Sequence, residues 1–188
     1  MNIGIDIDDT ITNTLEILIP YVSKNSALDI GKLKESNKMS YDKILEQYKD
    51  KIKEIGKVMF EQVLPNVTLK EDAKEIIDKL KSEGNKIIII TARDKAFYDK
   101  AFEFTSNQLN NLGINYDKLF CTYNKRQVCI DEKIDLFIDD SIANCSKVNE
   151  LGIETIVFNS KSNIKDKTNL YRVDNWEEIY EKIKKGSY

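Results

Sequence analysis

Short, strongly apolar runs recur along this chain, and they constrain its fold more than any other feature. They lie at residues 3–7, 86–90, 135–138 and 155–158, with a weaker run at residues 119–121. The run at residues 86–90 contains four consecutive isoleucines. Runs this short and this apolar are typical of strands buried on both faces, as in a parallel sheet.

Segments with a helical spacing of apolar residues lie between these runs. One such stripe is followed by Gly84, and two others end at Gly113 and Gly152, where glycine commonly stops a helix. Strand, helix and glycine in repeated order predict an α/β fold of β-α-β units with right-handed crossovers. The stripes consist of Ala73, Ile76, Ile77 and Leu80; of Phe97, Ala101, Phe104, Thr105 and Leu112; and of Ala143, Val148 and Leu151.

The connection after the first run is exceptionally long. About 60 residues separate this run from the helix before the second, whereas a βα connection usually takes about 2–6. Residues 14–64 are rich in Lys, Glu, Tyr and Leu, and Pro65 marks the return to the core. We expect a core domain of residues 1–13 and 65–188 with a helical cap of residues 14–64 over the carboxyl end of the sheet; the alternative is a helix pair packed on the core without a role. The apolar positions that favour helices in this insert are Leu15, Leu18, Val22, Ile44, Leu45, Tyr48, Ile52 and Ile55.

Composition excludes several classes of function. The 188 residues include 29 Lys and Arg against 32 Asp and Glu, so the net charge is -3. This balance argues against nucleic acid as a partner, because such binding needs a basic face. Histidine is absent, which excludes Ser-His and Cys-His nucleophiles and His-ligated zinc. Acid–base chemistry must therefore come from carboxylates, Lys, Tyr or Cys.

The cysteines and the apolar runs bear on compartment. Cys121, Cys129 and Cys145 are odd in number and lack a C-x-x-C spacing, so we expect free thiols of a reducing compartment. No signal peptide is visible, and no run approaches the roughly 20 apolar residues of a membrane span. The expectation is a cytoplasmic protein without a membrane partner.

Polar and acidic residues follow the apolar runs. They are Asp6 and Asp8 in and after the run at residues 3–7, Thr91 and Arg93 after the run at residues 86–90, and Asp139 and Asp140 after the run at residues 135–138. Because the carboxyl ends of parallel strands line one crevice, we expect these side chains to meet there. The period of two along an extended chain places Asp6 and Asp8 on the same face.

Carboxylates gathered in one place need compensating positive charge, because each raises the pKa of the others. A hard cation such as Mg²⁺ takes oxygen ligands from carboxylates and water, and a lysine can add a further charge. Lys125 is the best candidate because it follows the run at residues 119–121 and opens the next helix. Lys118 and Lys133 are alternatives.

These residues match a known family in order and spacing. Asp6-Ile7-Asp8-Asp9-Thr10 resembles the first motif of haloacid dehalogenase-like (HAD) phosphatases, Ile90-Thr91-Ala92-Arg93 the second, Lys125 the third, and Ile138-Asp139-Asp140-Ser141 the fourth. The resemblance covers nearly the whole chain and implies a Rossmann-like α/β core, with the insert as a C1-type cap. Within the family, the cap, the Asp139-Asp140 pair and Asn175-Trp176-Glu177 are most similar to the 5'(3')-deoxyribonucleotidase group. That group tends to carry Gly-Val in place of Asp9-Thr10 and Ser-Pro in place of Ala92-Arg93.

The resemblance also implies a role for each site residue. Asp6 is expected as the nucleophile and Asp8 as the acid and base, with Asp8 protonated at the start because acids surround it. Mg²⁺ is expected on Asp6, the Asp8 backbone carbonyl and Asp140, with Asp139 orienting a metal-bound water. Thr91, the Ala92 backbone N–H and Lys125 are expected to hold the phosphoryl group. Arg93 is a candidate substrate contact, with a surface ion pair as the alternative.

The resulting hypothesis is a Mg²⁺-dependent phosphomonoesterase that acts on a small molecule through an aspartyl-phosphate, as a 5'-nucleotidase or deoxyribonucleotidase. The alternatives are a phosphatase for sugar phosphates or other small metabolites, and a non-catalytic protein that binds a phosphate ligand. Aromatic residues of the insert either pack or stack on a nucleobase, and Trp176 is expected to anchor the last helix in the core. Those aromatic residues are Tyr21, Tyr41, Tyr48 and Phe60.

Overall fold

The computed structural model describes residues 1–18 and 52–186. Its described strands form one six-stranded sheet in the order β3-β2-β1-β4-β5-β6, and every neighbouring pair is parallel. The predicted α/β fold with a central parallel sheet is therefore confirmed. The strands are β1 (Asn2–Ile5), β2 (Lys86–Thr91), β3 (Lys118–Cys121), β4 (Leu136–Asp139), β5 (Glu154–Phe158) and β6 (Tyr171–Val173).

The apolar runs are explained by burial on both faces of the sheet. In β2, Ile87 and Ile89 join the apolar cluster on one face, while Ile88 and Ile90 join the cluster on the other. In β1, a Cβ atom on Gly4 would lie 3.1 Å from Ile90 and from Phe137. The second face is thus packed closely against the backbone of the central strand.

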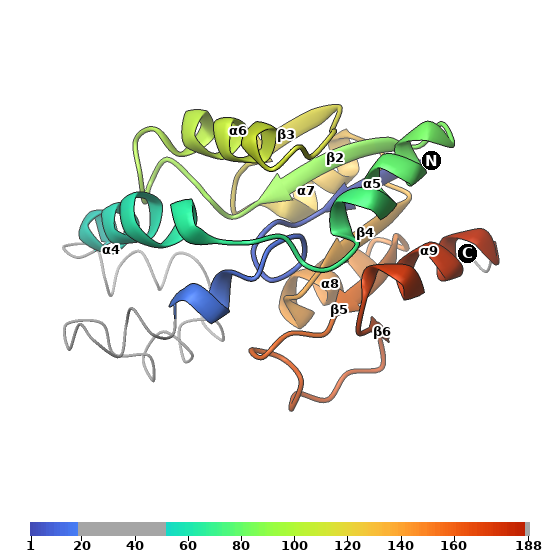
Figure 1. Ribbon diagram of the computed structural model, residues 1–188. Helices are drawn as coiled ribbons and strands as arrows, with labels where there is room; N and C mark the ends of the chain where they lie inside the picture. The colour runs from blue at the N-terminus through green and yellow to red at the C-terminus, as the bar shows by residue number, and fades with distance from the viewer. Residues whose placement is uncertain (19–51, 187–188) are drawn as a thin grey trace.

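Helices cover both faces of the sheet (Figure 1). Buried residues of α5 (Ala73–Ser82), α6 (Ala101–Asn111) and α9 (Trp176–Lys184) contribute to the first cluster. Residues of α7 (Lys125–Asp131) and α8 (Ile142–Asn149) contribute to the second. Trp176 is fully buried and donates its indole N–H to the carbonyl of Thr10 at 3.1 Å, which confirms it as the anchor of the last helix.

Several element boundaries differ from the sequence prediction. The first strand ends at Ile5, so Asp6 begins the segment that leaves the sheet. Helix α6 begins at Ala101, because Phe97 lies in a turn closed by its N–H on the carbonyl of Asp94 at 3.0 Å. In α8, Cys145 and Val148 face the core, whereas Ala143 is exposed. Strand β6 was not predicted, because it has three residues and buries only Val173.

The described parts of the insert are helical. Residues 14–18 are in helix, and the return path comprises α4 (Ile52–Val58), a π-helical turn η1 (Met59–Val63) and a 3-10 turn η2 (Leu64–Asn66). Figure 1 shows α4 beyond the carboxyl ends of the strands, on the side away from both termini. The predicted division at residues 13 and 65 stays a prediction. Tyr21, Val22, Tyr41, Ile44, Leu45 and Tyr48 lie outside the described residues.

The return path packs tightly on α6 and on the loop before it. Phe60 stacks on Tyr98 with ring centroids 4.7 Å apart, and it meets Phe104 edge-on at 5.4 Å. Phe60 is therefore a packing residue with 3% exposure, and it is not available to a nucleobase. A Cβ atom on Gly56 of α4 would lie 2.0 Å from the carbonyl oxygen of Phe97, so only glycine allows this approach.

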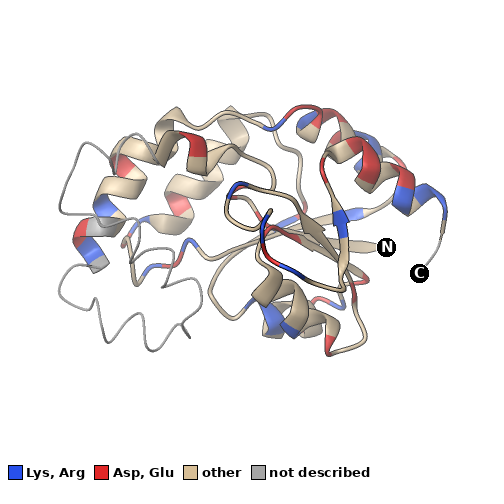
Figure 2. Cartoon of the chain, turned by 90° about the horizontal axis from the view of Figure 1, so that it is seen from below, with Lys and Arg blue, Asp and Glu red and all other residues tan. Residues whose placement is uncertain are grey.

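Charges on the last helix follow its dipole. Helix α9 carries Glu177 and Glu178 in its first turn and Lys182 and Lys184 in its last turn, so basic residues gather toward the C-terminus (Figure 2). This order favours the helix, since acids are stabilising near an N-terminus and bases near a C-terminus. Among the described helices, none has the length and apolar character to cross a membrane.

Candidate active site at the carboxyl ends of the strands

The topology brings the predicted acidic residues together. Strand β1 lies between β2 and β4, so Asp6 after β1 is flanked by Thr91 at the end of β2 and Asp139 at the end of β4. The backbone N–H of Asp6 donates to the carbonyl of Ile138 at 2.9 Å, which ties the residue after β1 to β4. The expected convergence at one edge of the sheet is confirmed for these three residues.

Lys125 lies at the centre of this cluster. Its Nζ contacts Asp6 Oδ1 at 2.5 Å and Asp139 Oδ2 at 2.7 Å, and the residue is 4% exposed. It is the first residue of α7, which Asn124 caps by accepting a hydrogen bond from Gln127 N. Burial alone would lower the pKa of Lys125, but the two carboxylates raise it overall, so the ammonium stays charged. The alternative Lys118 pairs instead with Glu132.

The buried carboxylates carry more negative charge than Lys125 offsets. Burial, with Asp139 and Asp8 nearby, raises the pKa of Asp6 to about 7 against the opposing effect of Lys125. Burial, with Asp139 and Asp6 nearby, also raises the pKa of Asp140 well above its usual range. One oxygen from each of Asp6, Asp139 and Asp140 lies within 4.8 Å of the others. A set of oxygen donors with excess negative charge fits a hard divalent cation such as Mg²⁺.

Asp139 is held firmly by its own loop and by α8. Its Oδ1 accepts from the backbone N–H of Ser141 at 2.7 Å, and its Oδ2 accepts from Asn144 Nδ2 at 3.0 Å as well as from Lys125. Both carboxylate oxygens of Asp139 therefore already accept hydrogen bonds from neighbouring residues. The predicted role of Asp139 in orienting a metal-bound water stays a prediction.

Three residues that sequence reasoning missed hold Asp140. Ser160 Oγ and Ser162 Oγ each lie 3.0 Å from Asp140 Oδ2, and Asn163 Nδ2 donates to the Asp140 carbonyl at 2.7 Å. All three lie in the segment directly after β5. The sequence did contain a signal for these residues, because they follow the apolar run at residues 155–158 just as Asp139 and Asp140 follow the run at residues 135–138. Residues after the carboxyl end of a parallel strand are candidates for the site, and this rule selects them too.

Asp8 is paired with Arg93. The guanidinium donates from Nε to Asp8 Oδ2 at 2.9 Å and from Nη2 to Oδ1 at 2.8 Å, and Thr14 Oγ1 donates to Oδ1 at 2.7 Å. Burial opposes the charged form of Asp8, but Arg93 and these hydrogen bonds outweigh it and lower the pKa of Asp8. The expectation that surrounding acids keep Asp8 protonated is therefore wrong. The cation in direct contact prevails over the acids around it.

Arg93 is not the surface residue of the alternative interpretation. It is 5% exposed, and its Nη1 donates to Gln108 Oε1 of α6 at 2.5 Å. Gln108 in turn donates from Nε2 to the carbonyl of Leu64 in the return path of the insert. A buried chain of contacts thus joins Asp8 to the end of the insert. Neither Gln108 nor this chain was identified from the sequence.

Asp9 and Thr91 have local structural roles. Asp9 adopts a left-handed backbone with φ of 60° and accepts the N–H of Leu15 at 2.9 Å, which shapes the turn into the first helix of the insert. Thr91 is fully buried, and its hydroxyl accepts the backbone N–H of Arg93 at 3.4 Å. The predicted contacts of Thr91, Ala92 and Arg93 with a phosphoryl group stay predictions.

The cysteines are free thiols, as the sequence predicted. Burial raises the pKa of Cys121 to about 11 and of Cys129 to about 12. A thiol needs a lowered pKa to act as a nucleophile near neutral pH. These two residues therefore have no catalytic character.

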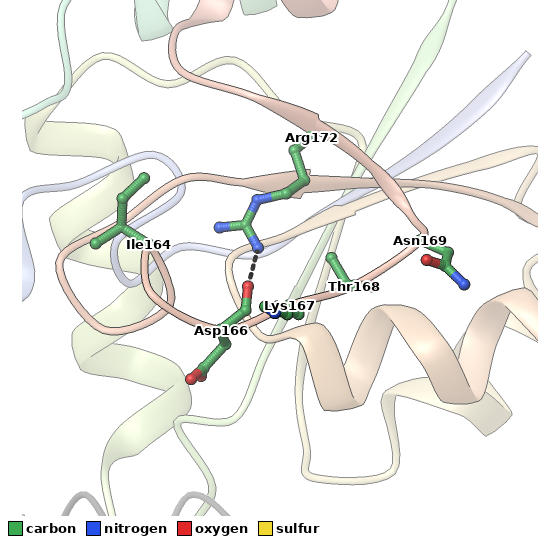
Figure 3. Close-up of a pocket in the computed structure, with 6 residues that line it drawn as sticks. All are labelled: Ile164, Asp166, Lys167, Thr168, Asn169 and Arg172. Atoms are coloured by element: carbon green, nitrogen blue, oxygen red, sulfur yellow. Dashed lines mark hydrogen bonds between the residues drawn. The ribbon is translucent and has the colours of Figure 1, made fainter.

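A separate cavity of about 570 Å³ lies in the segment between β5 and β6 (Figure 3). The acidic cluster, which consists of Asp6, Asp139 and Asp140, does not line it. Within it, Arg172 Nη1 donates to the carbonyl oxygen of Asp166 at 3.1 Å (Figure 3). The residues that line the cavity belong to β6 and to the segment between β5 and β6, which also contacts Asp140. Its lining residues are Ile164, Asp166, Lys167, Thr168, Asn169 and Arg172.

Solved structures with the same fold include several HAD hydrolases. A HAD-superfamily hydrolase from Ehrlichia chaffeensis is 17% identical with a TM-score of 0.56, and the match covers 98% of this chain and 96% of that one. A Bacillus subtilis protein described as a "putative HAD-hydrolase" and solved with bound magnesium is 15% identical with a TM-score of 0.64 over 97% of each chain. A Rhodobacter sphaeroides protein solved with phosphate is 13% identical with a TM-score of 0.65 over 95% of each chain. At these identities the likeness shows the fold.

Sequence comparison identifies the family. A Chlorobaculum tepidum protein named "Putative 5'(3')-deoxyribonucleotidase" is 32% identical over 114 residues. The aligned segment is 60% of this chain and 54% of that protein, so it spans about half of the relative's length. Residues 1–186 match the family described as "5' nucleotidase, deoxy (Pyrimidine), cytosolic type C protein". The chain therefore belongs to the deoxy (pyrimidine) 5' nucleotidase, cytosolic type C family, and it has the fold of HAD-superfamily hydrolases.

Proposed function

We propose that this protein is a Mg²⁺-dependent phosphomonoesterase that hydrolyses nucleoside monophosphates through an aspartyl-phosphate on Asp6. The observation that carries the proposal is the buried contact of Lys125 with Asp6 and Asp139, beside Asp140. It joins a carboxylate nucleophile, a fixed cation and oxygen ligands for a metal. Membership of the nucleotidase family supports the same reading.

Asp6 is suited to nucleophilic attack on phosphorus. Its Oδ1 is oriented by Lys125, and ionisation is required for attack because only the carboxylate has a free electron pair of sufficient basicity. The pKa of about 7 shows that the surroundings do not fully compensate this ionisation. Bound Mg²⁺ would supply the missing positive charge and polarise the phosphoryl oxygens, with Asp6 and Asp140 as the side chains that hold it.

Proton transfer is assigned to Asp8. In the first step the bond between Asp6 and phosphorus forms, the ester bond breaks, and Asp8 gives a proton to the departing alcohol oxygen. In the second step Asp8 takes a proton from the water that attacks phosphorus, and Asp6 is released. The ionised Asp8 of this structure suits the second step, and the first requires its pKa to rise.

Arg93 supplies a reason for that rise. A phosphate group is a strong bidentate partner for guanidinium and competes with a carboxylate for it. When a substrate phosphate takes contacts from Arg93, Asp8 loses part of the interaction that lowers its pKa. Arg93 is in this way both a partner of Asp8 and a contact for substrate, and Lys125, Thr91 and the Ala92 N–H stabilise the charge that spreads over the phosphoryl oxygens.

The nucleotide part of the proposal rests on the family and on the related Chlorobaculum protein. The test is phosphate release with Mg²⁺ across deoxynucleoside and ribonucleoside monophosphates, sugar phosphates and an aryl phosphate. We expect nucleoside monophosphates to give the highest kcat/KM, with deoxy forms at least equal to ribo forms. A sugar phosphate preferred by about tenfold, which is about 1.4 kcal/mol of transition-state stabilisation, would contradict the nucleotidase assignment.

A further inference from the structure

The segment between β5 and β6 binds only one of the two carboxylate oxygens of Asp140. The hydroxyl oxygens of Ser160 and Ser162 each lie 3.0 Å from Oδ2 and 2.6 Å from one another. Within the described part of the chain, no hydrogen bond reaches Oδ1. The two oxygens of this carboxylate are therefore made unequal by the fold.

The segment that carries the two serines is itself held in place. Asn163 Nδ2 donates to the Asp140 carbonyl and to the Phe158 carbonyl, both at 2.7 Å, and its Oδ1 accepts the N–H of Ser160 at 3.2 Å. Asn163 is 4% exposed, so these contacts are shielded from water. The segment is thus fastened both to β5 and to the residue that it supports.

Arg172 of β6 braces the same segment. Its Nη2 donates to Asn163 Oδ1 at 2.6 Å and its Nε donates to Asn159 Oδ1 at 2.6 Å. Figure 3 shows its guanidinium reaching from the strand into this segment, toward Asp166. Arg172 thus ties β6 to Asn159 and Asn163, on either side of the two serines.

We propose that Ser160 and Ser162 restrict Asp140 to one-oxygen coordination and thereby favour Mg²⁺ over Ca²⁺ at this site; the inference rests on the proposed metal site. Mg²⁺ requires a near-octahedral set of single oxygens at about 2.1 Å, whereas Ca²⁺ accepts six to eight oxygens and often takes both from one carboxylate. Hydrogen bonding from this pair of hydroxyls to Oδ2 opposes the second mode, because Oδ2 would have to give up that hydrogen bonding to reach the metal. Ser160 and Ser162 are positioning residues, since they act on the metal through Asp140.

The test is to titrate the metal-free protein with MgCl₂ and, separately, with CaCl₂, and to measure each Kd by isothermal titration calorimetry. The double variant S160A/S162A is expected to lose about 10- to 100-fold in Mg²⁺ affinity, the usual effect of removing partners of metal ligands. Its Ca²⁺ affinity should change less, so the ratio of the two Kd values shifts toward Ca²⁺ by tenfold or more. The separate variant S160T/S162T keeps both hydroxyls and should retain the wild-type preference for Mg²⁺ over Ca²⁺.

The control is Ser82→Ala on α5, where an exposed serine donates to the Lys79 carbonyl far from the acidic cluster. An unchanged Kd ratio in the double variant, or an equal shift in Ser82→Ala, would overturn the inference. Should the double variant not fold by circular dichroism, Ser162→Ala carries the same comparison, because Ser162 is exposed. A wild-type protein that binds no Mg²⁺ would instead overturn the proposed metal dependence itself.

Discussion

Arg93 donates two parallel hydrogen bonds to Asp8, from Nε to Oδ2 at 2.9 Å and from Nη2 to Oδ1 at 2.8 Å. The two residues are 85 positions apart in the sequence, and they follow the neighbouring strands β1 and β2. Paired charges in this fork geometry are stronger than single contacts. The pair sets the resting state of the proposed acid and base, and it predicts how that residue responds to mutation.

Arg93→Met should destabilise the protein and raise the pKa of Asp8. Breaking a buried pair costs about 3–5 kcal/mol, and the partial exposure of Asp8 reduces this to about 1–3 kcal/mol near neutral pH. The pKa of Asp8 is lowered in the folded state, so this stability exists above the usual pKa of Asp and disappears as pH falls through the lowered one. Urea unfolding at about pH 7 and pH 3 measures both effects.

The control for this substitution is Arg126→Met, where an exposed arginine donates to the Lys147 carbonyl. It should cost less than about 0.5 kcal/mol at either pH. If Arg93→Met were equally harmless near neutral pH, the pair would have no part in holding Asp8.

Asp9→Asn should stabilise the protein in alkaline but not in acidic solution. Burial raises the pKa of Asp9 from 3.8 to about 6. For an acid with a raised pKa, the favourable contribution is complete below the unfolded pKa and is lost as pH rises through the folded one. Asn keeps an oxygen for the Leu15 N–H and tolerates the left-handed backbone, so above about pH 7 we expect a gain of about 1–3 kcal/mol and near pH 4 none.

The measurement is the free energy of unfolding against pH, in chelator so that no metal contributes. Asp72→Asn is the matched control, because Asp72 has a φ of 59° and is exposed. A gain of the same size in both variants, or a gain that does not depend on pH, would refute the assignment to burial of Asp9.

Gly56→Ala should disturb the packing of the insert's return path on the core. The added Cβ would lie 2.0 Å from the Phe97 carbonyl oxygen, so α4 must move away from the loop before α6. Overpacking of this kind costs about 1–3 kcal/mol. We expect a lower Tm and a changed near-ultraviolet circular dichroism signal, since the Phe60–Tyr98 stack lies in the same contact. Lys57→Ala, at an exposed position of the same helix, should leave both unchanged.

Removal of divalent metal should abolish turnover. The acidic cluster cannot hold a phosphate dianion beside its own excess charge without a cation in addition to Lys125. Phosphate release should fall to background in EDTA and return on addition of Mg²⁺, whereas Ca²⁺ should bind without restoring the rate because its looser coordination misplaces the reacting oxygens. Full activity in a rigorously metal-free sample would exclude this account.

The sheet and the acidic cluster could be predicted because both depend on local pattern. Apolar runs such as residues 86–90 mark strands buried on both faces, and parallel strands carry the residues after them to one edge. Asp6 and Asp139 follow from this rule. Lys125 does not follow from it, and is preferred to Lys118 and Lys133 because it opens the helix after residues 119–121. Strand β6 escaped it, because a three-residue edge strand with one buried side chain has no periodic pattern.

The protonation state of Asp8 could not be predicted, because it depends on the direction of one side chain. Arg93 could have faced solvent or substrate, and its course is set by Gln108 on α6, which also holds the Leu64 carbonyl. Such a three-way contact involves segments far apart in the chain and leaves no periodic signal. The serine hydroxyls that contact Asp140 were easier to predict. Ser160 and Ser162 follow an apolar run, so they could have been selected as residues at the carboxyl end of a strand.

The most direct test of the central claim is to trap the phosphorylated nucleophile. Protein with Mg²⁺ and a deoxynucleoside monophosphate is quenched in acid and treated with borohydride, which reduces an acyl phosphate to an alcohol, and its peptides are analysed by mass spectrometry. We predict the reduced product at Asp6 in the wild type, none in Asp6→Asn, and phosphate release by that folded variant at background. Undiminished phosphate release by Asp6→Asn, with no modification at position 6 in the wild type, would contradict the account.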